Sequence, residues 1–206
     1  MLLATTLSVL ALPASAAAID AAWVLRQLAQ PAPSHSAFVE LRGSALLKEP
    51  LRVSGHYRRP DAATLVREVQ QPYQETTTIA GDRVTIARQG KPPRVFALSR
   101  APELADLQQS FGALLSGDLA ALEQRYQLNV RGTAQQWVLA LVPKDPALGK
   151  RVRTVSLYGA SDQLRCIETE PSKGDVQRTL MGSAANAGAT VVDAAALTAL
   201  CHGRAL

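Results

Sequence analysis

Reactive side chains are few in this sequence, and their spacing matches no common catalytic or metal-binding pattern. The three histidines are His35, His56 and His202, and none of them belongs to an H-E-x-x-H zinc motif. The chain has no G-x-S-x-G nucleophile elbow and no C-x-x-C pair, and Gly90-Lys91 lacks the rest of a phosphate-binding loop. We therefore expect a protein that is not an enzyme and that uses no metal ion and no cofactor. A hydrolase built from scattered residues is the weaker alternative.

The N-terminal segment has the features of a secretory signal peptide. Residues 1–18 carry no charge and hold a short apolar run, and the small residues around Ala16 and Ala18 offer cleavage sites. The basic residue that usually precedes such a run is absent, which leaves open a start further upstream. The run is too short and too rich in Ala, Ser and Thr for a membrane anchor. We predict cleavage near Ala16 or Ala18, export to the periplasm, and one domain over residues 19–206.

Cys166 and Cys201 are the two cysteines of the sequence. An even number of cysteines in an oxidising compartment predicts one disulfide bond between them. The bond would close a loop of about 35 residues and stabilise the fold by about 3–4 kcal/mol in the chain-entropy treatment. The alternative is two separate buried thiols. A catalytic cysteine is disfavoured, because no motif places a histidine or asparagine beside either residue.

Charge and composition exclude several classes of protein. The 22 Lys and Arg residues exceed the 17 Asp and Glu residues by five, and most of the basic residues are arginines that alternate with apolar residues in strand-like runs. Nucleic-acid-binding proteins cluster such charges and interleave aromatic residues, so we expect no nucleic-acid partner; mild attraction to anionic lipid is compatible with this charge. The 47% apolar content excludes a disordered chain, and the 4% aromatic content leaves a core of Ala, Leu and Val.

Alternating apolar and polar residues predict strands along most of the chain. The predicted strands cover residues 38–47, 51–59, 65–69, 75–80, 83–88, 94–98, 126–131, 136–142, 152–158, 163–169 and 176–181. Helical spacing or capping predicts helices over residues 20–30, 102–115 and 119–125, with Asp20 and Asp118 as N-caps. Residues 182–189 are small and polar, and we expect a loop there.

Many short strands with helices at the start and in the middle predict a fold that is mainly β with some α. The expected architecture is an open, incomplete antiparallel β-barrel, or strongly curved sheet, closed by short lid helices. An apolar sheet face has to be covered, and the helices are the available covers. A covered sheet of this size encloses either a packed core or a ligand cavity.

Short motifs, taken in order along the chain, resemble those of the periplasmic outer-membrane lipoprotein carrier family, the LolA-like family. They are the strand that ends in Arg59-Pro60, the hairpin with Gln71-Pro72-Tyr73 and Ile79-Ala80-Gly81-Asp82, the lid segment Leu114-Leu115-Ser116-Gly117-Asp118, the strand from Trp137-Val138-Leu139 to Lys144, and the charged hairpin over residues 164–181. Two features depart from the family pattern. Residues 83–87 replace a usually aromatic stretch, and the C-terminal segment with Cys201 is untypical. The resemblance therefore indicates a divergent LolA-related branch.

The resemblance implies a monomeric carrier, a chaperone for transport in outer-membrane biogenesis. It would shield the acyl chains of a lipoprotein or another lipid in a hydrophobic cavity. An inner-membrane transporter would supply the cargo and an outer-membrane acceptor would receive it. A lipid- or lipoprotein-sensing regulatory domain is the alternative.

The resemblance also implies roles for individual residues. Arg59 matches the family's arginine that hydrogen-bonds lid carbonyls in the closed state, and an ordinary surface arginine is the alternative. Apolar residues of the strands and lid are the candidate cavity residues, with plain core packing as the alternative for each. They are Leu65, Ile79, Phe96, Leu107, Phe111, Leu115, Trp137, Leu139, Val155 and Leu157.

Overall fold

The computed structural model describes residues 19–42, 50–100 and 112–203. Its strands are β1 (Ser34–Arg42), β2 (Leu51–Arg59), β3 (Thr64–Gln71), β4 (Glu75–Ala80), β5 (Arg83–Arg88), β6 (Arg94–Ala97), β7 (Tyr126–Thr133), β8 (Gln136–Pro143), β9 (Val152–Ala160), β10 (Gln163–Pro171) and β11 (Gln177–Met181). Its helices are α1 (Ala21–Leu28), the short 3-10 helix η1 (Leu98–Arg100), α3 (Leu119–Arg125), α4 (Pro146–Gly149), α5 (Gly182–Ala187) and α6 (Ala194–Cys201). Residues 112–116 are also helical.

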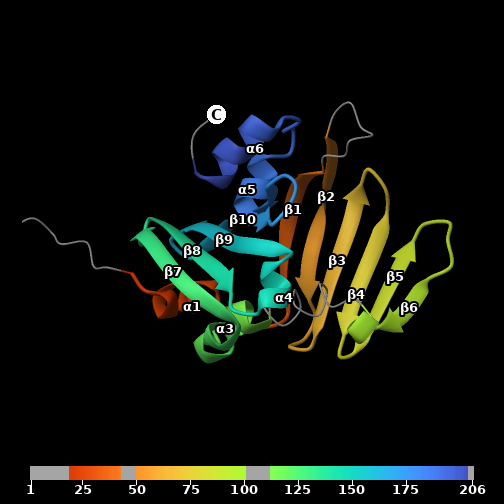
Figure 1. The fold of residues 1–206 in the computed structure, drawn as a ribbon. Helices are drawn as coiled ribbons and strands as arrows, with labels where there is room; N and C mark the ends of the chain where they lie inside the picture. The colour runs from red at the N-terminus through yellow and green to blue at the C-terminus, as the bar shows by residue number, and fades with distance from the viewer. Residues whose placement is uncertain (1–18, 43–49, 101–111, 204–206) are drawn as a thin grey trace, which may run out of the picture.

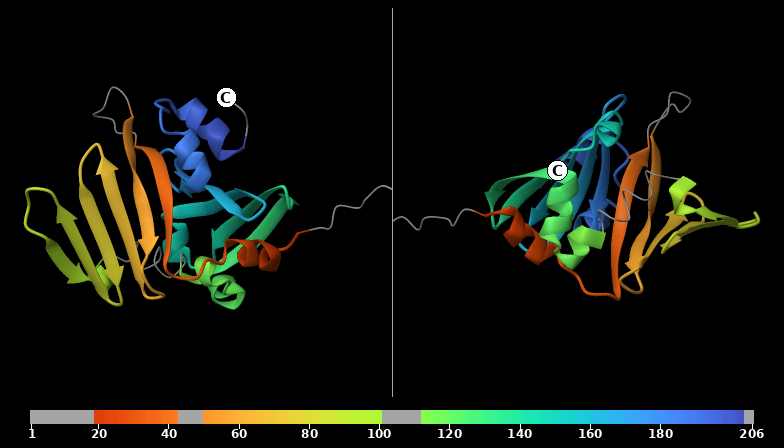
Figure 2. Two further views of the ribbon diagram at one scale, coloured as in Figure 1. Left: turned by 180° about the vertical axis from the view of Figure 1, so that it is seen from behind. Right: turned by 60° about the horizontal axis from the view of Figure 1, so that its bottom comes forward.

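All of these strands belong to one antiparallel sheet, in the order β6-β5-β4-β3-β2-β1-β11-β10-β9-β8-β7. Two meanders, β1 to β6 and β7 to β11, are joined where the first strand pairs with the last. β6 and β7 are the two edges and do not pair with each other, so the sheet is not closed into a barrel. Figures 1 and 2 show its strong bend, with β8 and β9 running across the direction of β2 to β5. The predicted mainly-β, open antiparallel architecture is confirmed.

Two sets of helices cover opposite faces of the sheet (Figure 1). We call the face that packs against α1 and residues 112–116 the inner face, and the face that packs against α5 and α6 the outer face. The inner cluster joins Val24, Leu25 and Leu28 of α1 to strand residues that include Trp137 and Leu157. The fold therefore consists of one central sheet with helices on both sides.

Aspartate side chains begin both predicted helices that the structure describes in full. The Asp20 carboxylate accepts a hydrogen bond from the Trp23 backbone N–H at 2.7 Å, and Asp118 accepts one from Ala121 at 3.0 Å. Each bond satisfies an N–H that has no partner within the helix. The predicted helix over residues 102–115 lies partly outside the described residues, and the predicted signal peptide over residues 1–18 lies wholly outside them.

Strand register decides which face each side chain occupies, because residues that pair directly across antiparallel strands share a face. Leu65, Ile79, Val84 and Phe96 pair in succession from β3 to β6. On β8 and β9, Leu139 pairs with Leu157, within the inner cluster.

The row of paired residues from Leu65 to Phe96 and the pair of Leu139 with Leu157 both lie on the inner face. Leu164 and Ile167 of β10 show how the two parts of the sheet join, because they pack against the β8–β9 cluster and also against the neighbouring cluster around Phe38 and Val53.

Trp137 lies fully buried beneath α1 because the neighbouring strand has no side chain to obstruct it. Its cross-strand partner is Gly159, and a Cβ atom at that position would come within 2.0 Å of the indole ring. The indole N–H donates to the Ser161 carbonyl oxygen at 3.0 Å. Gly159 is therefore required by the packing of the largest residue in the core.

Substituting Gly159 by alanine is expected to lower the free energy of unfolding by about 1–3 kcal/mol, the usual cost of overpacking a core. Denaturant unfolding would measure it. Gly149→Ala is the matched control, because a Cβ atom there meets nothing within 4 Å, and it should change stability by less than about 0.5 kcal/mol. Equal effects of the two substitutions would contradict the packing argument.

The C-terminal part of the chain differs from its prediction. The expected loop over residues 182–189 is wrong, because residues 182–187 form α5, and α6 follows. Ala184 and Ala185 are buried in the outer cluster, where small side chains let the helix pack closely against the sheet. Alanine has the highest helix propensity but shows no apolar periodicity, which is why the pattern did not reveal this helix.

None of the helices in the described part of the chain combines the length and the apolar character needed to cross a bilayer.

Candidate functional site

A cavity of about 600 Å³ opens beneath α1 and residues 112–116 on the inner face and extends past the end of β11 to the start of α5. Its walls come from α1, residues 112–116, β1 to β3, β9 to β11 and the start of α5. The large apolar residues that line it are Leu28, Leu65, Leu114, Leu115, Leu157, Leu164, Ile167 and Met181. The volume lies in the range of about 300–1,000 Å³ that is usual for small-molecule pockets. This cavity is our candidate functional site.

Polar side chains border the apolar part of the cavity. His35 and His56 come from β1 and β2, whereas Gln163, Ser183 and Asn186 come from β10 and α5. The Ser183 hydroxyl donates to the Gln163 side-chain oxygen at 2.8 Å, which ties α5 to the β9–β10 turn. The cavity can therefore hold a molecule that has both an apolar and a polar part.

Arg59, at the end of β2, connects the sheet to the helical cover. Its side chain is buried, with 9% exposed, and Nη1 donates to the Gln30 carbonyl oxygen at 3.0 Å. The Gln30 N–H donates in turn to the Leu115 carbonyl oxygen at 3.1 Å. A guanidinium group holds such a carbonyl strongly because its donors are charged and fixed in geometry. Arg59 thus fixes Gln30 in the segment after α1, and Gln30 in turn holds residues 112–116 through Leu115.

A charged cluster lies on the inner face. Glu40 pairs with Arg67 at 2.6 Å and with Arg42 at 2.8 Å, and it accepts a hydrogen bond from the Thr179 hydroxyl at 3.3 Å. The Arg67 guanidinium lies 4.6 Å from the centre of the Phe38 ring. These contacts compensate the Glu40 charge within the protein, as a partly buried carboxylate requires.

Tyr57 lines the cavity beside this charged cluster. Burial raises the pKa of its phenol from the usual 10, against the opposing effect of the nearby Arg67. The phenol therefore stays neutral at physiological pH, and the cavity wall gains no negative charge there.

The structure brings some of the candidate cavity residues together and separates others. Leu65, Leu115, Leu157 and Arg59 line the cavity. Trp137, Leu139 and Val155 instead belong to the core beneath α1. Ile79 and Phe96 pack near the β6 edge around Val84 and Leu98. Leu107 and Phe111 lie outside the described residues.

Sequence reasoning missed most of the other cavity residues, including the whole polar border. Leu164, Ile167 and Met181 stand in strands whose alternation was recognised, but no local signal showed that β10 and β11 pack beside β1 and β2. The polar residues from α5 had no signal, because the helix itself was not predicted.

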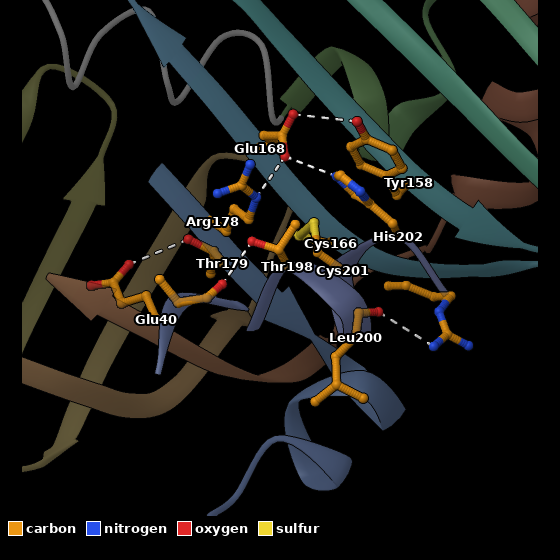
Figure 3. The surroundings of a disulfide bond; sticks show 12 residues. Glu40, Tyr158, Cys166, Glu168, Arg178, Thr179, Thr198, Leu200, Cys201 and His202 are labelled. Atoms are coloured by element: carbon orange, nitrogen blue, oxygen red, sulfur yellow. Dashed lines mark hydrogen bonds and ion pairs between the residues drawn. A yellow bond between two sulfur atoms is a disulfide. The ribbon is translucent and has the colours of Figure 1, made fainter. Parts of the chain in front are cut away.

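Cys166 and Cys201 form a disulfide bond that joins β10 to the end of α6 (Figure 3). Beside it, the Glu168 carboxylate accepts from Arg178 Nε at 2.7 Å and from the Tyr158 hydroxyl at 3.2 Å, and lies 3.0 Å from His202 Nε2. The side chains of Glu168, His202 and Cys201 lie close enough together to bind a metal ion, but the Cys201 sulfur is already part of the disulfide bond with Cys166. That leaves two ligands, fewer than a protein site for zinc provides.

The sequence of residues 13–205 matches the family model described as outer membrane lipoprotein carrier protein LolA-like. The chain belongs to this LolA-like family. The family resemblance inferred from the motifs is thereby confirmed. No curated protein sequence matches this chain.

Solved structures similar to this LolA-like chain have low sequence identity to it. A LolA superfamily protein from Nitrosomonas europaea is 14% identical, with a TM-score of 0.40 over 80% of this chain and 92% of that one. A chain of the Pseudomonas aeruginosa MucA/MucB complex is 20% identical, with a TM-score of 0.42 over 79% of this chain and 56% of that one. A separate MucB crystal structure is 20% identical, with a TM-score of 0.45 over 80% and 58%.

Proposed function

We propose that this protein carries the acyl chains of a lipoprotein or another lipid through the periplasm towards the outer membrane. The observation that supports the proposal is the cavity of about 600 Å³ beneath a helical cover that Arg59 holds in place. Membership of a family described as outer-membrane lipoprotein carriers agrees with it. No step of this function is a chemical reaction, so it needs neither a nucleophile nor a cofactor.

The cavity fits the physical problem that an acyl chain presents. Each methylene group exposed to water costs about 0.8 kcal/mol, so a carrier has to cover most of the chain. Apart from the aromatic Tyr57, the large apolar residues that line the cavity are seven Leu and Ile residues and one methionine, and such side chains adapt to a flexible alkyl chain. The polar border would contact the part of the cargo that carries its charges and hydrogen-bonding groups.

A carrier also has to release what it holds. We propose that cargo displaces α1 and residues 112–116 and that their return favours release. Such a displacement would uncover Trp137 and Leu139, which are fully buried beneath α1 when the cover is in place. These two residues would then join Leu65, Leu115 and Leu157 as contacts for the acyl chain. An inner-membrane transporter as donor and an outer-membrane protein as acceptor complete the proposed route.

Replacing Leu115 by glutamate is expected to weaken binding of a fluorescent polyene fatty acid by at least about tenfold. The half-buried Leu115 side chain lines the cavity, and an ionised carboxylate there would have to lose its water when the acyl chain enters. Fluorescence titration of the exported protein would measure the affinity.

Val95→Glu is the matched control for this experiment. Val95 is 50% exposed on the edge strand β6 and is not part of the cavity wall, so the same charge placed there should leave the affinity unchanged. Equal affinities of wild type and Leu115→Glu would place the acyl chain elsewhere and contradict the proposal. Transfer of the fatty acid from protein to acceptor vesicles would separate a carrier from a sensor, which binds the lipid without passing it on.

A further inference from the structure

A second crevice, of about 380 Å³, lies on the outer face of the sheet beside the end of α6. Arg131, Val138, Tyr158 and Cys166 pair in succession from β7 to β10, so they share the face that α6 covers through the disulfide. The first three line this crevice, together with Gln136, Arg165 and His202. Among the residues that the structure describes, none lines both this crevice and the cavity of about 600 Å³, so the two are separate.

The charge of the crevice comes from two arginines. No carboxylate is among the described residues that line it. Arg131 is exposed and forms no ion pair with any residue in the described part of the chain. Glu168, which lies beside His202 on the outer face, is already bonded to Arg178 and to the Tyr158 hydroxyl.

Arg165 is only partly satisfied by the protein. Its Nη2 lies 3.5 Å from the Leu200 carbonyl oxygen, at the limit for a hydrogen bond, and its Nε is buried with no hydrogen-bond partner among the described residues. A buried N–H without a protein partner is costly, and in native proteins a water molecule or a bound ion commonly satisfies it. Arg165 therefore has donor capacity that the described protein does not use.

The remaining walls are fixed in place. The Gln136 side-chain amide donates to the His202 carbonyl oxygen at 2.9 Å, which holds the end of α6 against β8. The rings of Tyr158 and His202 stack with their centres 4.5 Å apart (Figure 3). The disulfide anchors the same turn of α6, so the crevice keeps its shape without a ligand.

We propose that this crevice binds a phosphate group, held between the guanidinium groups of Arg131 and Arg165. Guanidinium groups bind phosphate oxygens in pairs, and two of them match the charge of close to −2 on a phosphate monoester. The stacked rings and Val138 add apolar walls, which suit a phosphate that belongs to an organic molecule. Its source is either the headgroup of an anionic lipid or a soluble phosphate ester.

The test uses the exported wild-type protein with two probes. Inorganic phosphate is titrated while backbone amide NMR shifts are followed, and cosedimentation is measured with vesicles of phosphatidylcholine alone or of phosphatidylcholine with phosphatidic acid, whose headgroup is a phosphate monoester. We expect saturable shifts at Gly132, Gly159 and Gly203, which line the crevice. Vesicle binding that soluble phosphate inhibits identifies a lipid headgroup, and phosphate binding without vesicle binding identifies a soluble ester.

Substitutions locate the binding. Arg131→Gln, at an exposed position, should weaken phosphate binding at least about tenfold, and Arg131→Gln/Arg165→Gln should abolish it. Arg153→Gln removes the same charge from a 62% exposed side chain that pairs with Glu170 away from the crevice, and it should have no effect. The proposal is overturned if the wild type shows no shifts at the crevice and no preference for anionic vesicles. A loss in Arg153→Gln as large as that in Arg131→Gln would overturn it as well.

Discussion

Replacing Arg59 by leucine is expected to leave cargo binding intact and to slow delivery to an acceptor by about ten- to a hundredfold. The Arg59 guanidinium donates to Gln30, and Gln30 holds Leu115, so the substitution removes the contact that links the sheet to the helical cover. A hydrogen bond from a charged donor contributes about 1.5–3 kcal/mol, and every 1.4 kcal/mol is a factor of ten. The closed, empty form loses this stabilisation, whereas the open, loaded form does not.

The closed form excludes the cargo, so closing of the protein favours release. When the closed form is less stable, this driving force is smaller and release becomes slower. The measurement is transfer of a fluorescent acylated peptide from the protein to acceptor vesicles, with equilibrium affinity measured in parallel. Arg52→Leu is the matched control, since Arg52 lies on the same strand, bonds to Ser54 and Gln71, and does not line the cavity. Equal transfer rates in wild type and Arg59→Leu would show that Arg59 is not a latch.

Removing the disulfide with Cys166→Ala/Cys201→Ala is expected to lower the free energy of unfolding by about 3–4 kcal/mol. The bond closes a loop of 35 residues between β10 and the end of α6, and opening that loop gives the unfolded chain more conformational freedom. Alanine suits both positions because each cysteine is fully buried in the apolar outer cluster. Urea unfolding would measure the change.

A second measurement separates the cross-link from packing. Wild type unfolded in the presence of a reductant should lose nearly as much stability as the double variant, because both lack the same loop constraint. A loss below about 1 kcal/mol in both experiments would mean that α6 is held by its other contacts and that the loop contributes little.

The strands were predictable because apolar and polar residues alternate along them, and in the structure the apolar residues of neighbouring strands share a face. Leu65, Ile79 and Phe96 stand on separate strands, and the register of β3 to β6 places them on one face. The turn Gly81-Asp82 is where the sequence places it, between β4 and β5. The N-caps Asp20 and Asp118 were also predictable, because each cap is formed by one side chain directly before its helix in the sequence.

The site was harder to predict because it depends on contacts between distant parts of the chain. Nothing local shows that β11 pairs with β1, although this pairing brings Thr179 to Glu40 across 139 residues. Trp137 was expected in the cavity, yet α1 covers it, and the position of a helix over a sheet cannot be derived from the strand's own pattern. Arg59 was found only through the family motif, because an arginine at a strand end is ordinarily exposed.

Mass spectrometry of organic extracts from the protein, expressed with a signal peptide that exports it to the periplasm, tests the carrier proposal most directly. The proposal predicts an acylated molecule in close to one-to-one ratio with the wild-type protein, and less of it in Leu115→Glu. It also predicts that Val95→Glu retains the wild-type amount. Wild-type protein that yields no acylated molecule, or the same small amount as Leu115→Glu, would contradict a carrier that holds acyl chains in this cavity.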